Sequence, residues 1–186
     1  MALASDIVLL GLYDAKISPM TADTTGSPTY GTAIDVPGGI MMAFTPTMES
    51  KELKGDGAIL STFSKIVGGE MEIKMAKLPL SALATLQGGA LSATGTTPNQ
   101  INTSDLNATG LPAYFKIEGA WDPAEVGYGD VHMIVWKCKV MEPPTVSVND
   151  ANGDYGDVTV KGKAVWTISD GKLYSIVQNE TKTAIA

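Results

Sequence analysis

The chain has 186 residues, 44% of them hydrophobic, which is enough for one domain with an ordinary core and excludes wholesale disorder. Its 13 basic residues are all lysines and stand against 20 acidic residues, for a net charge of −7. A negative chain without arginine disfavours a site that grips phosphate groups or binds nucleic acid tightly. The 20 glycines and 10 prolines favour a β-rich protein with many turns.

The N-terminal segment and the single cysteine bear on where the protein folds. An apolar run at residues 7–10 follows Asp6 and has no basic residue before it, which predicts that it is not a signal peptide. No apolar run approaches the roughly 20 residues of a membrane span. Cys138 has no partner for an intrachain disulfide, which fits a reducing compartment. We therefore expect folding in the cytoplasm.

Before residue 79 the chain is predicted to form strands, because apolar and polar residues alternate with a period of two. The alternation is clear at residues 70–78, where Met71, Ile73 and Met75 alternate with charged side chains. One face of that strand is expected to be buried. Residues 19–30 are predicted to form a loop. Weaker strand patterns occur at residues 7–17, 39–45 and 58–67.

One helix is predicted at Pro79–Gln87, where leucines recur every three residues. Pro79 suits the first turn of a helix, and Gly88 with Gly89 supplies a stop. The following residues, 88–112, are rich in Gly, Ser, Thr and Asn, which indicates a long loop.

The C-terminal part is again predicted to be strands. Residues 131–140 are apolar on both faces, which is typical of a central strand covered on both sides. At residues 157–168 the apolar positions extend from Val158 to Trp166 and Ile168. Two further strands are predicted at residues 113–121 and 173–178. The simplest assembly is a mainly β, antiparallel sandwich or barrel with one flanking α-helix and long loops, a single domain over residues 1–186.

Catalytic and metal-binding patterns are weak. His132 is the only histidine and lies in the most apolar strand, so a structural role is favoured over catalysis. Residues 150–154 begin like a calcium loop, but Tyr155 and Lys161 stand where that motif needs Gly and Glu. The segment Asn149–Asp157 is better interpreted as an Asx-rich turn. We expect no enzyme activity, no metal and no cofactor.

A short segment of mixed charge is the best candidate for a contact between copies. Residues 49–56 alternate in sign, with one apolar side chain among them. A solvated loop is the simple interpretation. A segment with both signs can also complement a neighbouring copy in a ring or stack. The candidate contact residues are Glu49, Lys51, Glu52, Lys54 and Asp56.

Four local features follow one another in this region, at Lys51–Asp56, Ala58–Phe63, Val67–Lys74 and Pro79–Gly88. They are a Glu-Leu-Lys-Gly-Asp segment, a strand pattern, Gly-Glu with an alternating strand, and a short helix pattern ending in Gly. This order resembles the tail-tube (major tail) proteins of long-tailed siphophages, in which a Glu-Leu-x-Gly-Asp type segment is followed by the same elements. The C-terminal third agrees with the family in pattern only.

The resemblance implies a subunit that forms hexameric rings stacked into a hollow tube, assembled in the host bacterial cytoplasm and carried in the virion tail. The implied partners are other copies of the chain, a tape-measure protein, and tail-tip and tail-terminator proteins. DNA would pass through the lumen without tight binding, which suits an acidic, arginine-free chain. Two alternatives stay open: a tube subunit of a contractile tail or type VI-like injection system, and a ligand-binding β-sandwich module.

Overall fold

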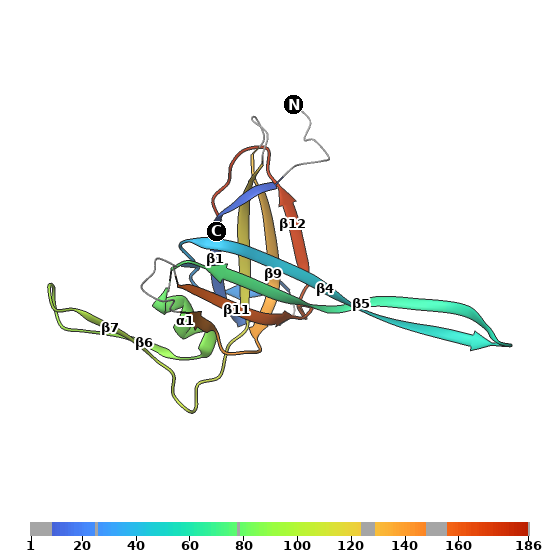
Figure 1. Ribbon diagram of the computed structural model, residues 1–186, viewed down its shortest axis with the longest axis horizontal. Coiled ribbons are helices and arrows are strands. Elements are labelled where there is room, and N and C mark those ends of the chain that lie inside the picture. Colours follow the sequence, from blue (N-terminus) through green and yellow to red (C-terminus); the bar gives the residue numbers. More distant parts are fainter. Residues whose placement is uncertain (1–8, 25, 78, 124–128, 148–155, 186) are drawn as a thin grey trace.

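The computed structural model describes residues 9–24, 26–77, 79–123, 129–147 and 156–185 (Figure 1). The chain folds into a mainly β architecture with antiparallel strand pairing throughout the large sheet and one short helix in the described part. In chain order the elements are β1 (Leu9–Ala22), β2 (Thr29–Tyr30), β3 (Ile34–Asp35), β4 (Gly39–Gly55), β5 (Ala58–Met75), α1 (Leu80–Gln87), β6 (Ala90–Thr94), β7 (Ile101–Asp105), β8 (Phe115–Pro123), β9 (Val131–Val140), β10 (Thr145–Ser147), β11 (Asp157–Ala164) and β12 (Tyr174–Gln178).

The large sheet runs in the order β2-β1-β8-β9-β11-β5-β4 and folds over on itself at β9. One half of β9, from Val131 to Val135, pairs with β12, whereas its end, from Cys138 to Val140, pairs with β11. The two groups of strands therefore cross at a steep angle and face each other as the layers of a sandwich (Figure 1). The layers approach closely at Gly119, where an added Cβ would lie 2.7 Å from the sulfur of Met42 on β4.

The core lies between these layers. Phe115, Ile117 and Val135 enter it from β8 and β9, and Met71 and Ile73 enter it from β5. All five side chains are at most 2% exposed. Burial of this apolar surface is the main stabilising contribution, because each fully buried side chain of this kind contributes about 1.5–3 kcal/mol.

The helix α1 closes the core beside β5 and β11. Pro79 precedes it in an extended conformation, and Gly88 ends it with a φ of 72°. A Cβ at Gly88 would lie 2.3 Å from the carbonyl oxygen of Leu111, so glycine is needed here both for its backbone conformation and for its size. No helix in the described ranges is long and apolar enough to cross a membrane.

The predicted fold class is confirmed, and the central strand has the expected bounds, with strands paired along both of its edges. The helix is also confirmed, from Leu80 to Gln87. The loop predicted at residues 88–112 is wrong in part, because β6 and β7 pair there as a second hairpin. Likewise, β1 extends into the predicted loop at 19–30 as far as Ala22.

The strand predicted at residues 157–168 ends earlier, at Ala164. Beyond it the chain turns back, and the hydroxyl of Thr167 and the backbone of Lys172 bond each other. Trp166 and Ile168 therefore leave the core and are 41% and 76% exposed. The calcium-like segment at 150–154 and most of the Asn149–Asp157 turn lie outside the described residues.

Candidate functional site: a projecting hairpin

The strands β4 and β5 form a hairpin that extends far beyond the body of the protein (Figure 1). They pair from Gly39 with Met75 to Gly55 with Ala58. Two residues make the turn, Asp56 and Gly57, with φ angles of 51° and 77°. Two positive φ angles are typical of a type I′ turn, whose twist matches that of paired strands. The pair Asp-Gly is a strong sequence signal for such a turn.

The outer part of the hairpin has no core of its own. All side chains from Thr45 to Lys54 on β4 and from Ala58 to Lys65 on β5 are exposed. At about 3.4 Å per residue, the part beyond Thr47 is roughly 27 Å long. An isolated two-stranded hairpin is at best marginally stable in water. This one nevertheless carries large exposed apolar side chains: Met48, Leu53, Ile59, Leu60 and Phe63, each 56–64% exposed.

The candidate contact residues all lie on this hairpin, in a strand and its turn and not in a flexible loop. Glu49 lies opposite Lys65 across the two strands. Glu52 and Lys54 form an exposed ion pair of 3.2 Å. Surface pairs of this kind contribute about 0–1 kcal/mol to folding, so these charges do little for the stability of the folded chain.

The register places apolar and charged side chains together on one face of the hairpin. Lys51 lies directly opposite Phe63, and Leu53 lies opposite Ser61. Side chains at opposite positions and two residues apart share a face, so Leu53 and Phe63 are diagonal neighbours about 7–8 Å apart. Lys51 lies beside both of them. The charges of residues 49–56 therefore lie on a two-stranded ribbon that also exposes Leu53 and Phe63. We call this outer part of the hairpin the apolar ribbon.

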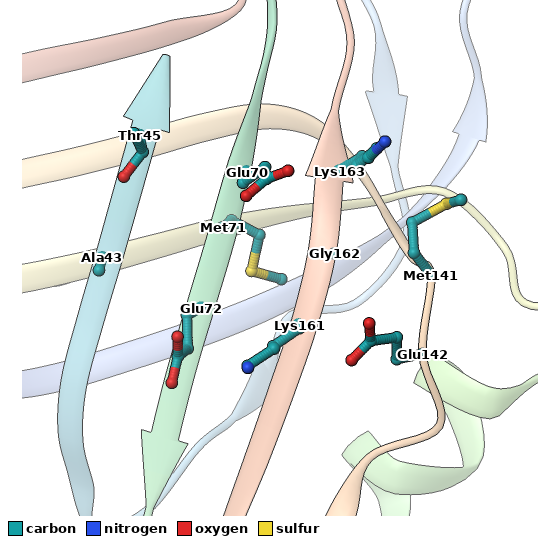
Figure 2. Close-up of a pocket in the computed structure, with 10 residues that line it drawn as sticks. All are labelled: Ala43, Thr45, Glu70, Met71, Glu72, Met141, Glu142, Lys161, Gly162 and Lys163. Atoms are coloured by element: carbon teal, nitrogen blue, oxygen red, sulfur yellow. The ribbon is translucent and has the colours of Figure 1, made fainter. Parts of the chain in front are cut away.

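At the base of the hairpin, the outer face of the large sheet carries glutamates and lysines on adjacent strands. A depression of about 240 Å³ lies over β4, β5 and β11 (Figure 2). There Glu72 is paired in register with Lys161, and Glu70 with Lys163. Opposite charges at such positions attract each other across the strands. Glu142 lies at the edge of the depression and is not part of these two pairs. The two cross-strand pairs indicate a solvated sheet face, since four of its five charges face an opposite charge within the chain.

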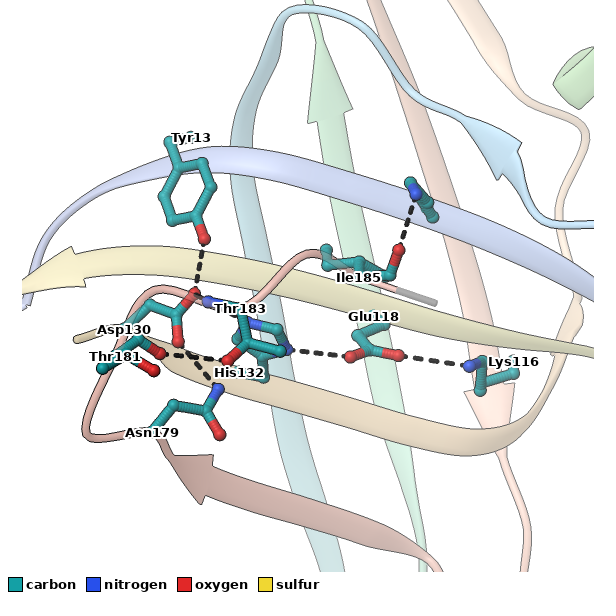
Figure 3. A network of polar contacts seen from close by, with 10 residues as sticks. Tyr13, Lys116, Glu118, Asp130, His132, Asn179, Thr181, Thr183 and Ile185 are labelled. Carbon is teal, nitrogen blue, oxygen red and sulfur yellow. Dashed lines mark hydrogen bonds and ion pairs between the residues drawn. The ribbon is translucent and has the colours of Figure 1, made fainter.

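A buried polar network lies on the other layer, around His132 (Figure 3). Its Nδ1 is 2.9 Å from an oxygen of Glu118 and its Nε2 is 3.1 Å from Oδ2 of Asp130. The imidazole is 4% exposed, Glu118 6% and Asp130 1%. Both ring nitrogens face carboxylates, and both can donate only if the ring is protonated. The ring therefore has no nitrogen free to accept a proton from a substrate.

Asp130 also fixes the C-terminal segment. Its carboxylate accepts hydrogen bonds from the hydroxyl of Tyr13 at 2.6 Å, the side-chain amide of Asn179 at 2.7 Å and the backbone N–H of Thr183 at 2.9 Å. The ammonium of Lys16 donates to the carbonyl oxygen of Ile185 (Figure 3). The network thus fastens the chain after β12 onto β1 and β9.

The network shifts the acidity of its members in opposite directions. Burial by itself would raise the pKa of Asp130, but the hydrogen bonds from Tyr13, Asn179, Thr183 and His132 outweigh it and hold that pKa below its ordinary value. Burial would lower the pKa of His132, but the hydrogen bonds to Glu118 and Asp130 outweigh it and raise that pKa. Each shift stabilises the charged form of its group, so the buried cation and its carboxylates support one another.

Other reactive groups do not converge on a site in the described part of the chain. No group of three His, Cys, Asp or Glu side chains there could hold a metal ion. Cys138 is fully buried, and burial raises the pKa of its thiol, so the thiolate form is disfavoured.

Neither a comparison with known protein families nor one with curated proteins finds a match to this chain. The candidate site therefore depends on the geometry of the hairpin. Sequence reasoning found its charges and weak strand patterns at 39–45 and 58–67, but it missed the length of the hairpin and left the apolar side chains out of the candidate contact. The signal that could have located it is the dipeptide Asp56-Gly57 between two segments with strand pattern.

Proposed function

We propose that this protein is a structural subunit that works by self-assembly, forming rings that stack into the tail tube of a long-tailed siphophage. The observation that carries the proposal is the projecting hairpin, which exposes five large apolar side chains with no cover from its own chain. The register places Leu53 and Phe63 on one face and Met48 and Ile59 on the other, so both faces are partly apolar. Large apolar side chains gathered on an exposed element are typical of a surface that contacts a partner.

The form of the hairpin supports a contact with another copy. It is long enough to reach beyond its own subunit, and β4 has no strand on its outer edge in the described part of the chain. An unpaired edge can accept a further strand, as closure of a ring requires. The acidic, arginine-free composition suits a tube through which DNA slides without binding tightly.

The ligand-binding alternative has less support. A β-sandwich that binds sugars normally presents an exposed aromatic platform. Here the indole ring of Trp136 is covered by the ammonium of Lys172 at 5.0 Å, and its N–H donates to Ser175. Trp166 is the more exposed ring, at 41%.

Electron microscopy and light scattering of the purified protein test the proposal. We expect rings or tubes at high protein concentration, or at lower concentration when a tail-tip complex is added as a seed. Only monomers at millimolar concentration, with and without the seed, would contradict self-assembly.

A further inference from the structure

A groove of about 440 Å³ lies beside α1, between the segment that follows β7 and the segment that follows β9. Its floor is apolar, since it includes Leu86 and Val140, which are 1% and 7% exposed. The walls add exposed apolar side chains, among them Leu106 at 58% and Met141 at 59%. A concave, mostly apolar site of this size is typical of a binding site.

The charge on the wall of the groove is negative. Among the described residues that line the groove, Glu142 alone is charged. The apolar face of the hairpin has the matching character, because Lys51 lies beside Leu53 and Phe63. An apolar pair with a neighbouring cation thus fits an apolar groove with an anion on its wall.

The groove and the tip of the hairpin lie on different sides of the subunit. The hairpin projects from one side, whereas α1, β6 and β7 lie on the other (Figure 1). A subunit therefore cannot place its own hairpin in its own groove. A contact between these two surfaces must join two copies head to tail, and such a heterologous contact propagates into a ring or a stack.

We propose that the groove beside α1 receives the hairpin tip of a neighbouring copy, with Phe63 and Leu53 against Leu86, Leu106 and Met141 and with Lys51 beside Glu142. This inference rests on the proposed self-assembly and adds the surface that accepts the hairpin. It makes each subunit a donor at one side and an acceptor at the other.

A groove-filling variant gives the first test. Ala108 is exposed and lines the groove, so Ala108→Trp should fill it without disturbing the core. The matched control is Ala93→Trp, on the exposed strand β6 outside the groove. We expect Ala108→Trp to raise the protein concentration needed for assembly about tenfold or more, and Ala93→Trp to assemble like the parent. Circular dichroism melting verifies that both variants fold.

Cross-linking gives a second test that does not depend on loss of assembly. Cys138 is 0% exposed, so the parent chain should not react with a short bis-maleimide cross-linker. Ser61→Cys, on the same face as Phe63, mixed with Asn107→Cys on the wall of the groove should give a cross-linked dimer, because both changes keep the apolar contact residues. Thr62→Cys, on the opposite face of the hairpin, should give far less with the same partner.

Each outcome decides the inference. If the parent assembles but Ser61→Cys does not cross-link to Asn107→Cys, or if Ala108→Trp assembles normally, the groove is not the acceptor and self-assembly still stands. Equal loss in Ala93→Trp also rejects the groove as the specific acceptor. If an apolar dye binds the groove and stays bound in assembled protein, the groove is a ligand site instead. If the parent never assembles, both proposals fail.

Discussion

Replacing Phe63 with threonine removes one apolar side chain from the hairpin while keeping a residue that favours strands. Full burial of a phenylalanine contributes about 1.5–3 kcal/mol. Phe63 is 64% exposed in the subunit, so about a third of that contribution, roughly 0.5–1 kcal/mol, belongs to the monomer. The remaining roughly 1–2 kcal/mol is available only when another copy covers the ring. A loss of that size weakens each contact about 5–30-fold.

Two measurements separate these contributions. Melting of the dilute monomer reports the contribution of Phe63 to folding. The concentration at which light scattering rises reports its contribution to the contact between copies. Ile176→Thr is the control, because Ile176 is 66% exposed and lies on β12 in the body of the sheet. The reasoning is refuted if Phe63→Thr assembles at the same concentration as the parent, or if Ile176→Thr weakens assembly equally.

Three further predictions concern charge. Changing both Lys51 and Lys54 to Glu gives residues 49–56 five acids. The monomer should melt within about 0.5 kcal/mol of the parent, because these residues are exposed, but it should fail to polymerise and salt should partly rescue it. Normal tubes would reject the segment as a contact. Replacing His132 with leucine removes the ring's hydrogen bonds to the buried Asp130 and Glu118, whereas Lys116 still pairs with Glu118 at 3.1 Å. The variant should lose about 1.5–3 kcal/mol in chemical unfolding; no loss would mean that water replaces the ring. The raised pKa of His132 adds stability that is fully present below its ordinary value of about 6.5 and is lost as pH rises through the higher pKa of the folded protein. The parent should therefore lose more stability than His132→Leu as the pH rises from about 6, and parallel pH curves would contradict this.

The sequence predicted those elements that bury a face. In β5 the alternation of Met71, Ile73 and Met75 follows directly from burial of one side of the strand. The helix was visible because Pro79 and Gly88 mark its two ends locally. Both kinds of signal are contained in a few neighbouring residues, so they can be seen without knowledge of the tertiary structure.

The projecting elements lack that signal. Beyond Thr47 neither face of β4 is buried within the subunit, so no apolar and polar alternation marks the strand. The same holds for β6 and β7, whose residues are almost all exposed and polar or small. A hairpin of this kind is specified by its turn residues and by its partner. The turn residues are visible in the sequence as Asp56-Gly57. Under the proposed self-assembly the partner surface lies on another copy, so the sequence around the hairpin does not show it.

The polar network was not predictable for a different reason. Its members, Tyr13, Glu118, Asp130, His132 and Asn179, are far apart in sequence and come together through the pairing of β1, β8 and β9. The sequence shows only that His132 lies within an apolar strand. It cannot show that carboxylates approach both nitrogens, which depends on the register between β8 and β9.

The charges of the hairpin have a consequence for how acidic subunits can meet. Copies with a net charge of −7 repel one another at long range. From Glu49 to Lys65 the hairpin holds three acids, at 49, 52 and 56, and three lysines, at 51, 54 and 65, so it is neutral as a whole. It can therefore approach another copy with little repulsion. Interspersed charges also discourage unspecific pairing along its edges. An apolar ribbon with balanced charges can remain soluble in a monomer and still bind a matching surface.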